Sequence, residues 1–281
     1  MTVSGHWVHD LDPVAFRLGG GWAVRYYGLA YALSFVIWGL LLWLLRRKGK
    51  SPLGLDEAVV VLTALVFGVF VGGRVGYLAI YAFDNALARP GHIMDLGGGG
   101  MASHGVFVGV ALAGWLAARH LKLSTLRLGD VLCALAPVAF VLGRLANFIN
   151  GEGWGRESDL SWAIVFPLSA PPGTPVELIP PRHPVALYGV ALEGIVLLGI
   201  IQWRLWCTNA LDRPGRLMGE FLVLYAILRL ACEAFREPGP ARVLGLPPAV
   251  LGTVLVALTG IAVIVLSKRN SANEAGREAR R

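Results

Sequence analysis

Residues 143–156 read GRLANFINGEGWGR and directly follow the apolar run 131–142. That run is typical of a membrane helix, yet it continues into Arg144, Asn147, Asn150 and Glu152. Arg144 and Asn147 are three residues apart, so they share one face of a helix. An arginine at membrane depth costs about 2.5–3.5 kcal/mol on insertion scales, so it requires a partner, a polar cavity or an anionic ligand. The glycines that follow end the helix and allow a close approach of the backbone.

The alternative interpretation is a helix end whose polar residues simply reach the headgroup layer. For an isolated arginine or asparagine that alternative is the better one. Here a guanidinium, two amides and a carboxylate lie within one stretch rich in glycine. The clustering favours a site, and Arg144, Asn147, Asn150 and Glu152 are its first candidate residues.

The composition indicates a membrane protein. Of 281 residues, 56% are hydrophobic and 15% are charged, whereas average proteins have about 25% charged residues. The three cysteines lie in or beside apolar runs without metal-ligand spacing, so we expect neither a disulfide framework nor a metal site. The N-terminus lacks the basic region of a cleaved signal peptide, so we expect the first apolar run to remain.

Apolar segments long enough to cross a bilayer recur along the chain. A span needs about 17–25 residues, and the candidates are residues 22–45, 58–83, 101–118, 131–150, 185–206, 219–235 and 244–266. The predicted fold is therefore an all-α polytopic membrane protein with seven transmembrane helices.

Basic residues alternate between the loops and predict the orientation. Fifteen of the 25 basic residues, including all four lysines, lie at the ends of the first, third, fifth and seventh spans or after them. Cytoplasmic loops carry the excess of Lys and Arg. The N-terminus is therefore expected outside and the C-terminus in the cytoplasm.

The spans and loops divide the chain into regions. We expect an external N-terminal segment (1–21), a membrane domain (22–267) and a cytoplasmic tail (268–281) that is disordered because it is charged and apolar-poor. The proline-rich loop 151–184 is long, and residues 161–166 have the composition of a short strand. It predicts a small external head inserted in the membrane domain.

A second polar group lies in the sixth span. Tyr225, Arg229, Glu233 and Arg236 follow one another at spacings of four, four and three, which places them on one stripe of a helix. Glu233 lies one turn beyond Arg229, so an ion pair within the helix is the structural alternative, and it accounts for Glu233 with Arg236 better than for Arg229. Arg229 lies so deep that it requires a partner or ligand.

Two further groups lie at the outer ends of predicted spans. His104 follows a glycine run at the start of the third span, and histidine is the side chain best suited to move a proton near neutral pH. Tyr27 opens the first span and His183 opens the fifth. Tyrosines at span ends are commonly interfacial residues, so position alone assigns Tyr26 and Tyr188 no role.

The outer half of the predicted bundle thus brings together arginines, a histidine, amides and tyrosines from different helices. Planar guanidinium groups in an apolar site suit a phosphate oxyanion. The sequence has no HExxH, GxSxG or Walker motif, so the predicted chemistry uses no metal or cofactor and acts on a lipid phosphate.

These residues occur in blocks that resemble the bacterial prolipoprotein diacylglyceryl transferase family. The blocks are RYYGLAY, MASHG, GRLANFINGEGWGR, PRHPVALY and YAILRLACEAFREP, in the family's order from residue 25 to 238. The resemblance implies a seven-span enzyme of the bacterial inner membrane with a periplasmic head. It implies transfer of diacylglyceryl from phosphatidylglycerol to the lipobox cysteine of a preprolipoprotein signal peptide, with release of glycerol phosphate. No nucleic-acid partner is expected.

The resemblance also assigns roles to individual positions. Arg144 and Arg229 match the family's essential arginines, and His104 matches its essential histidine. The required polar residues correspond to Tyr27, Asn147 and Glu152, and further family positions to Tyr225 and His183. The candidate catalytic residues are therefore His104, Arg144, Arg229, Tyr27 and Tyr225. The candidate substrate-binding residues are Arg144, Asn147, Asn150, Glu152, His183 and Glu233. One departure is Val106-Phe107, where the family commonly has a second glycine after the histidine–glycine pair.

Two other functions compete with this one. A transporter of lipids or anionic solutes would continue its polar residues through the inner halves of the spans, but residues 33–45, 108–117 and 195–201 are almost purely apolar. A non-catalytic scaffold would not explain arginines at membrane depth in separate spans.

Overall fold

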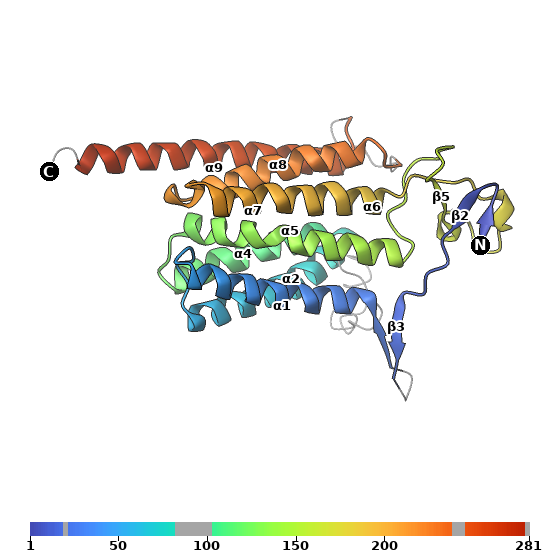
Figure 1. Ribbon diagram of the computed structural model, residues 1–281, viewed down its shortest axis with the longest axis horizontal. Helices are drawn as coiled ribbons and strands as arrows, with labels where there is room; N and C mark the ends of the chain where they lie inside the picture. The colour runs from blue at the N-terminus through green and yellow to red at the C-terminus, as the bar shows by residue number, and fades with distance from the viewer. Residues whose placement is uncertain (19–21, 82–102, 238–244, 279–281) are drawn as a thin grey trace. The chain divides into compact units, whose positions relative to one another are not determined.

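The protein is mostly helical in the computed structural model, which describes residues 1–18, 22–81, 103–237 and 245–278 (Figure 1). The long helices are α1 (Tyr26–Arg47), α2 (Leu55–Tyr81), α4 (Ser103–His120), α5 (Thr125–Ile149), α8 (Arg216–Glu233) and α9 (Pro248–Glu278). Residues 185–207 form a continuous helical segment, which consists of α6 (Val185–Gly189), the π-helical η5 (Val190–Val196) and α7 (Leu197–Cys207).

Five of the described helical segments are long and apolar enough to cross a membrane. They are Tyr26–Arg47, Leu55–Ala79, Thr125–Ile149, Val185–Cys207 and Pro248–Arg269, and Gly105–His120 is a shorter apolar helix. α8 does not meet that composition because it carries Arg216, Glu220, Arg229 and Glu233. The chain is therefore a mostly helical, multi-pass membrane protein.

Two expected boundaries differ from the structure. The first helix begins at Tyr26, because residues 23–25 form β4 (Ala23–Arg25), which pairs with β3 (Val14–Arg17) in an antiparallel hairpin. The last helix runs to Glu278, so the tail expected to be disordered from residue 268 is helical as far as 278. Its Ala, Glu and Arg residues are good helix formers that prolong a helix already nucleated.

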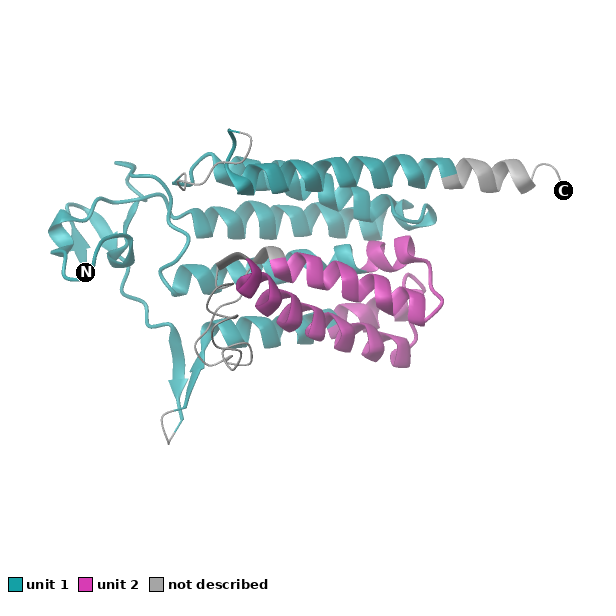
Figure 2. Ribbon diagram, turned by 180° about the vertical axis from the view of Figure 1, so that it is seen from behind, with its two compact units in different colours: residues 1–38, 132–281 teal, residues 39–131 magenta. Residues whose placement is uncertain are grey.

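The chain forms two compact units (Figure 2). One comprises Met1–Trp38 and Leu132–Arg281, and the other comprises Gly39–Val131. The division falls within α1 and α5.

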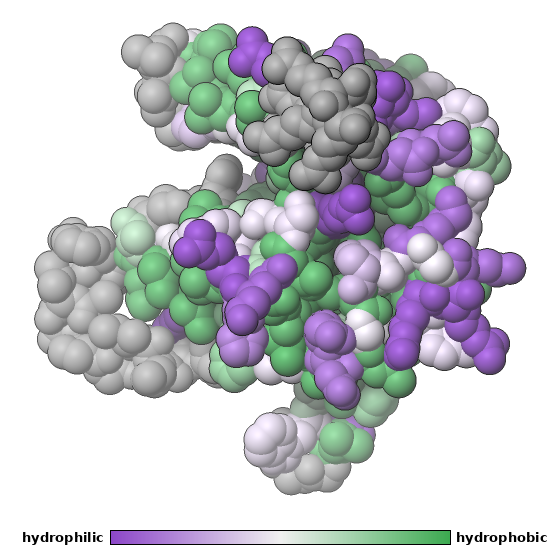
Figure 3. All heavy atoms as spheres, turned by 90° about the vertical axis from the view of Figure 1, so that its left-hand side faces the viewer, coloured by the Kyte–Doolittle hydropathy of each residue, from purple (hydrophilic) through white to green (hydrophobic). Residues whose placement is uncertain are grey.

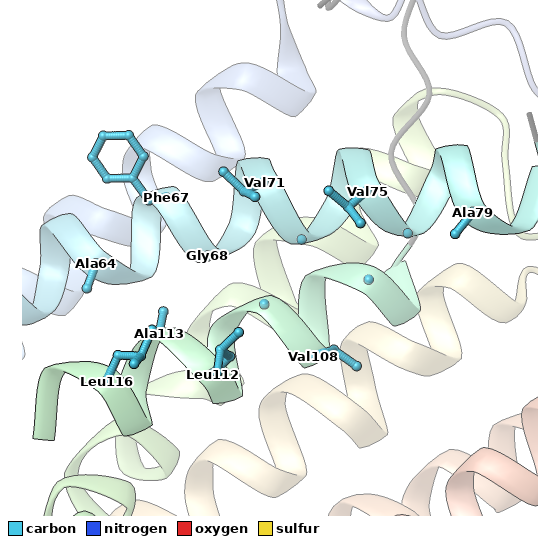
Figure 4. Close-up of a pocket in the computed structure, with 14 residues that line it drawn as sticks. Ala64, Phe67, Gly68, Val71, Val75, Ala79, Val108, Leu112, Ala113 and Leu116 are labelled. Atoms are coloured by element: carbon cyan, nitrogen blue, oxygen red, sulfur yellow. The ribbon is translucent and has the colours of Figure 1, made fainter. Parts of the chain in front are cut away.

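In the unit formed by residues 39–131, α2 and α4 pack closely because glycines line their interface. A Cβ on Gly72 would lie 2.4 Å from the carbonyl oxygen of Gly105, and one on Gly109 would lie 2.1 Å from that of Gly68. Small residues four apart let membrane helices approach in this way. Beside the contact runs an apolar groove of about 620 Å³. Its lining includes Val71 and Val75 of α2 and Leu112 of α4 (Figure 4).

In the other unit, glycines again allow close helix packing. A Cβ on Gly194 would lie 2.6 Å from Cγ2 of Val141, which brings the π-helical segment against α5. A Cβ on Gly219 would lie 2.8 Å from the carbonyl oxygen of Gly260, which brings α8 against α9. These contacts hold α5, α6–α7, α8 and α9 as neighbouring helices (Figure 1).

Charged residues join α7 to α8 at the end of this unit away from the head. Arg204 donates hydrogen bonds of 2.6 and 2.7 Å to both carboxylate oxygens of Glu220, and Arg216 donates a third of 3.0 Å. Figure 3 looks onto this end, where hydrophilic side chains gather. A bidentate pair of this kind fixes the register between the two helices.

A small sheet builds the predicted head region. β1 (Thr2–Val3) pairs antiparallel with β2 (His6–Val8), and β2 pairs parallel with β5 (Ile164–Val165). The short helices η3 (Pro167–Ser169) and η4 (Val176–Leu178) follow β5 in this region. A further short helix, η6 (Ala210–Asp212), lies outside the head, between α7 and α8. The strand expected within residues 161–166 is thus present, and its partner is the N-terminal segment.

Candidate active site

Two arginines from different helices meet at one buried carboxylate. Nη2 and Nε of Arg144, on α5, donate hydrogen bonds of 2.7 and 3.0 Å to Oε2 of Glu193 in the π-helical segment. Nη1 of Arg229, on α8, lies 3.6 Å from the other oxygen of Glu193. The Glu193 side chain is 1% exposed. The carboxylate therefore supplies the partner that a guanidinium at this depth requires.

The local backbone explains how Glu193 comes to face both arginines. It lies in Val190–Val196, a π-helical stretch between the α-helical stretches α6 and α7, and such stretches often occur at functional sites. Gly189 provides space for Arg144, because a Cβ there would lie 2.9 Å from Cδ of that arginine. A larger residue at position 189 would push the guanidinium away from its carboxylate.

A third arginine and a second carboxylate extend the charged group. Nη2 of Arg229 lies 2.8 Å from Oε2 of Glu233, one turn further along α8. The ion pair within this helix is therefore formed by Glu233 with Arg229, one of the two pairs that the spacing allowed. Burial lowers the pKa of Arg236, and the positive charges of Arg229 and Arg144 lower it further against the opposing effect of Glu233 and Glu193. Cations crowded in this way favour the binding of an anion.

Tyr225 is buried between this charged group and an aromatic stack. Its ring stacks on Phe140 of α5 with centroids 5.0 Å apart and on Phe221 at 6.2 Å. Arg229 lies one turn further along the same helix. The sequence prediction that Tyr225 and Arg229 share a stripe with the site is consistent with these positions.

A second polar cluster lies at the end of α5. Nδ2 of Asn147 donates to the Tyr27 hydroxyl and, at 3.2 Å, to Oε2 of Glu152. The Tyr27 hydroxyl donates to the same oxygen at 3.3 Å, and Asn150 donates to the other oxygen at 3.3 Å. The structure thus brings together four of the predicted site residues. Glu152 is exposed and is the acceptor that the other three share.

Arg144 lies between the two groups. It is one turn before Asn147 on α5, and its charge acts on Tyr27. Both of its hydrogen bonds to Glu193 come from Nε and Nη2, and Nη1 makes no hydrogen bond to the described residues. Nη1 is therefore a donor that a ligand could use.

His183 occupies a different setting from the arginines. Its Nδ1 lies 3.0 Å from the Tyr188 hydroxyl, and its ring packs against Phe235 with centroids 5.1 Å apart. Tyr188 in turn accepts a hydrogen bond of 2.8 Å from Trp162. Within the described part of the chain, no contact joins His183 to Arg144 or Arg229. These contacts are those of a residue that ties the head to the helix ends.

His104 is the second residue of α4. Its side chain lies outside the described residues, as does the glycine run before it. Its role therefore stays a prediction.

Glu193 is the residue that the sequence interpretation missed. It is the one acidic residue in the apolar stretch 185–207, and an ionisable residue inside a span is by default a functional candidate with a partner. Spacing along the sixth span pairs Arg229 only with residues of its own helix, such as Glu233. The same rule applied to the fifth span would have found Glu193.

A family model and several named proteins match this chain over most of its length. The family model described as prolipoprotein diacylglyceryl transferase matches residues 13–266. Proteins named phosphatidylglycerol–prolipoprotein diacylglyceryl transferase are similar to the chain. The one from Rhodopseudomonas palustris is 42% identical over 240 residues, which cover 82% of this chain and 79% of that protein. The one from Chromohalobacter salexigens is 39% identical over 278 residues, which cover 96% of this chain and 97% of that protein. The match spans both polar clusters, and the chain belongs to the prolipoprotein diacylglyceryl transferase family.

Proposed function

We propose that the protein transfers the diacylglyceryl group of phosphatidylglycerol to the thiol of a lipobox cysteine in a preprolipoprotein signal peptide. The sulfur attacks the glycerol carbon that bears the phosphate ester. A carbon–sulfur bond forms, the carbon–oxygen bond breaks, and its electron pair leaves with glycerol phosphate. The thiol proton passes to a base. The relatives' names state the lipid donor and the lipoprotein acceptor.

The observation that carries this proposal is the pair of arginines held by Glu193. The leaving group is a phosphate whose negative charge grows as the carbon–oxygen bond breaks. Guanidinium groups preorganised by a buried carboxylate stabilise that charge without reorganisation during the reaction. Arg144 retains a free donor for the phosphate, while Arg229 and Arg236 supply further positive charge.

The cluster at the end of α5 suits the remainder of the donor headgroup. Phosphatidylglycerol carries glycerol hydroxyls beyond its phosphate. The carboxylate of Glu152 accepts hydrogen bonds, and the amides of Asn147 and Asn150 both donate and accept them. We assign these residues to the hydroxyls and Tyr27, which bonds to Asn147 and Glu152, to the catalytic residues. Tyr225 is proposed as a further catalytic residue, and His183 and Glu233 as substrate-binding residues.

His104 is proposed as the base. A cysteine thiol has a pKa of about 8.5 and is mostly protonated near neutral pH, whereas the thiolate is the nucleophile. A neutral imidazole accepts that proton at this pH. The assignment rests on the match of MASHG to the family's histidine turn.

We further propose the seven-span topology, with the N-terminus outside the bacterial inner membrane and the C-terminus in the cytoplasm. The sequence regions are then an external segment (1–21), a membrane domain (22–267) with its periplasmic head (151–184), and a cytoplasmic tail. α4 and α8 supply the two spans that composition alone does not select. A reporter fused at the C-terminus should score as cytoplasmic, and one inserted at 171–175 as external; the reverse pattern would refute this topology.

The direct test uses purified protein, phosphatidylglycerol and a lipobox peptide. The expected product is a peptide with a thioether-linked diacylglyceryl mass, absent when serine replaces the peptide's cysteine. A transporter of lipids or anionic solutes would yield no such product, and would instead move lipid between the leaflets of a vesicle.

A further inference from the structure

His9 lies in the short N-terminal segment before residue 13, where the family match begins. Its backbone amide donates a hydrogen bond of 2.9 Å to the carbonyl of Val165, which continues the pairing of β2 with β5. Below this sheet Val8 packs with Val165 and Ile179 in a small buried cluster. The segment is thus anchored to the head by backbone pairing and by apolar contacts.

The His9 side chain leaves the sheet and reaches the end of α5. Its Nε2 lies 2.6 Å from the carbonyl oxygen of Phe148, and because a carbonyl only accepts, Nε2 carries the proton. Phe148 belongs to the last turn of α5, whose carbonyls have no partner within the helix. The same oxygen accepts the amide of Gly151 at 2.9 Å. His9 therefore caps the helix from a distant part of the sequence.

The imidazole also fixes the turn that follows the helix. Gly151 has a φ of +68°, and a Cβ there would lie 3.2 Å from Nδ1 of His9. The ring stacks on Phe166 with centroids 5.4 Å apart and meets Phe148 edge-on at 5.3 Å. The imidazole is enclosed by these groups, and His9 as a whole is 7% exposed. The next residue after Gly151 is Glu152, the shared acceptor of the polar cluster.

We infer that His9 is a positioning residue for Glu152. By capping α5 and packing on Gly151, it holds the carboxylate where Tyr27, Asn147 and Asn150 meet it. The effect on transfer rests on the proposed function, whereas the effect on the turn does not. His9 itself contacts no proposed substrate group.

The matched control is His6 on the same hairpin. Its Nδ1 lies 3.1 Å from the carbonyl of Ala163 in the same head, away from the Gly151 turn. His9→Phe keeps an aromatic ring but removes the hydrogen bond to Phe148. His9→Gln keeps a donor near the position of Nε2. His6→Phe removes a comparable hydrogen bond that the inference does not use.

The first measurement is hydrogen exchange at the amide of Glu152, which donates to the carbonyl of Asn147 at 2.9 Å. We expect faster exchange in His9→Phe, exchange near the wild-type rate in His9→Gln, and no change in His6→Phe. Equal exchange in His9→Phe and His6→Phe would overturn the inference even if the protein proved to have another activity.

The second measurement is transfer activity in a double-mutant cycle. We expect His9→Phe to lower kcat about three- to tenfold, the size of one net hydrogen bond, with a smaller change in KM. The double variant with Glu152→Gln should be no worse than Glu152→Gln alone, because His9 acts through that carboxylate. If the losses of kcat in the two single variants multiply in the double variant, His9 acts independently of Glu152 and has a merely structural role. An inactive wild-type protein would contradict the proposed function and leave the exchange result to decide the inference.

Discussion

Oε2 of Glu193 accepts hydrogen bonds from both Nε and Nη2 of Arg144, at 3.0 and 2.7 Å, between two mostly apolar helical segments. A charge pair of this depth offsets its cost of desolvation only when its geometry is good. The pair therefore fixes the rotamer of Arg144 and engages its Nε and Nη2 donors. Arg229 approaches the same carboxylate from α8.

Glu193→Gln should reduce both stability and transfer. The amide keeps the size of the side chain but leaves Arg144 without a countercharge and Arg229 with Glu233 alone, and breaking a buried pair costs about 3–5 kcal/mol. The double variant Glu193→Gln with Arg144→Gln should recover part of the stability but none of the activity. Thermal unfolding in detergent measures the first effect. Wild-type stability and turnover in Glu193→Gln would show that the pair has neither role.

Arg144→Lys and Arg229→Lys should each lose most of the turnover, although the charge is kept. Lysine is a point charge without the planar fork that bonds Glu193 and a phosphate together. Arg204→Lys is the matched control, since Arg204 also makes a bidentate pair, with Glu220, at the other end of the unit. We expect Arg204→Lys to alter stability and retain turnover. Equal losses in all three variants would indicate a general effect on folding.

Glu152→Gln should lower kcat/KM by about tenfold or more, because a carboxylate that accepts from Tyr27, Asn147 and Asn150 is replaced by a weaker acceptor. The loss should be larger with phosphatidylglycerol than with a donor that lacks the glycerol hydroxyls. Glu177→Gln, at an exposed position in the same head, is the control. An equal loss with both donors would remove Glu152 from headgroup recognition.

His104→Asn should remove transfer near pH 7 and regain part of it above a pH of about 8.5, where the thiol ionises without a base. The amide makes one of the imidazole's hydrogen bonds but accepts no proton at neutral pH. Turnover across a pH range of about 6.5–9.5 measures this. Activity close to wild type throughout would mean that His104 is structural, and a loss without rescue would mean that it acts on the leaving group or on substrate position.

The sequence predicts the helices well because their apolar runs are long. It also singles out Arg144 and Arg229, since a charged residue within such a run is costly wherever it lies. The pairing of Arg144 with Glu193 could not be predicted from spacing, because the two residues are 49 positions apart on different helices. The role of His9 could not be predicted from spacing either, because it depends on the parallel pairing of β2 with β5, which lie far apart in the sequence.

His183 and Tyr188 illustrate the opposite case. The resemblance selects His183 as a site residue, while position alone makes Tyr188 an interfacial tyrosine. In the structure they bond to each other and pack on Phe235. Such a cluster is built by side-chain packing between segments, which no local pattern in the sequence specifies.

The most direct test of the claim that sulfur attacks the glycerol carbon asks whether oxygen from water enters the released glycerol phosphate. The reaction is run in water enriched in ¹⁸O with phosphatidylglycerol and a lipobox peptide, and both products are weighed by mass spectrometry. Attack of sulfur on the glycerol carbon predicts unlabelled glycerol phosphate in a one-to-one ratio with diacylglyceryl-peptide. Glycerol phosphate that carries ¹⁸O, together with free diacylglycerol and unmodified peptide, would mean hydrolysis at phosphorus and would contradict the account.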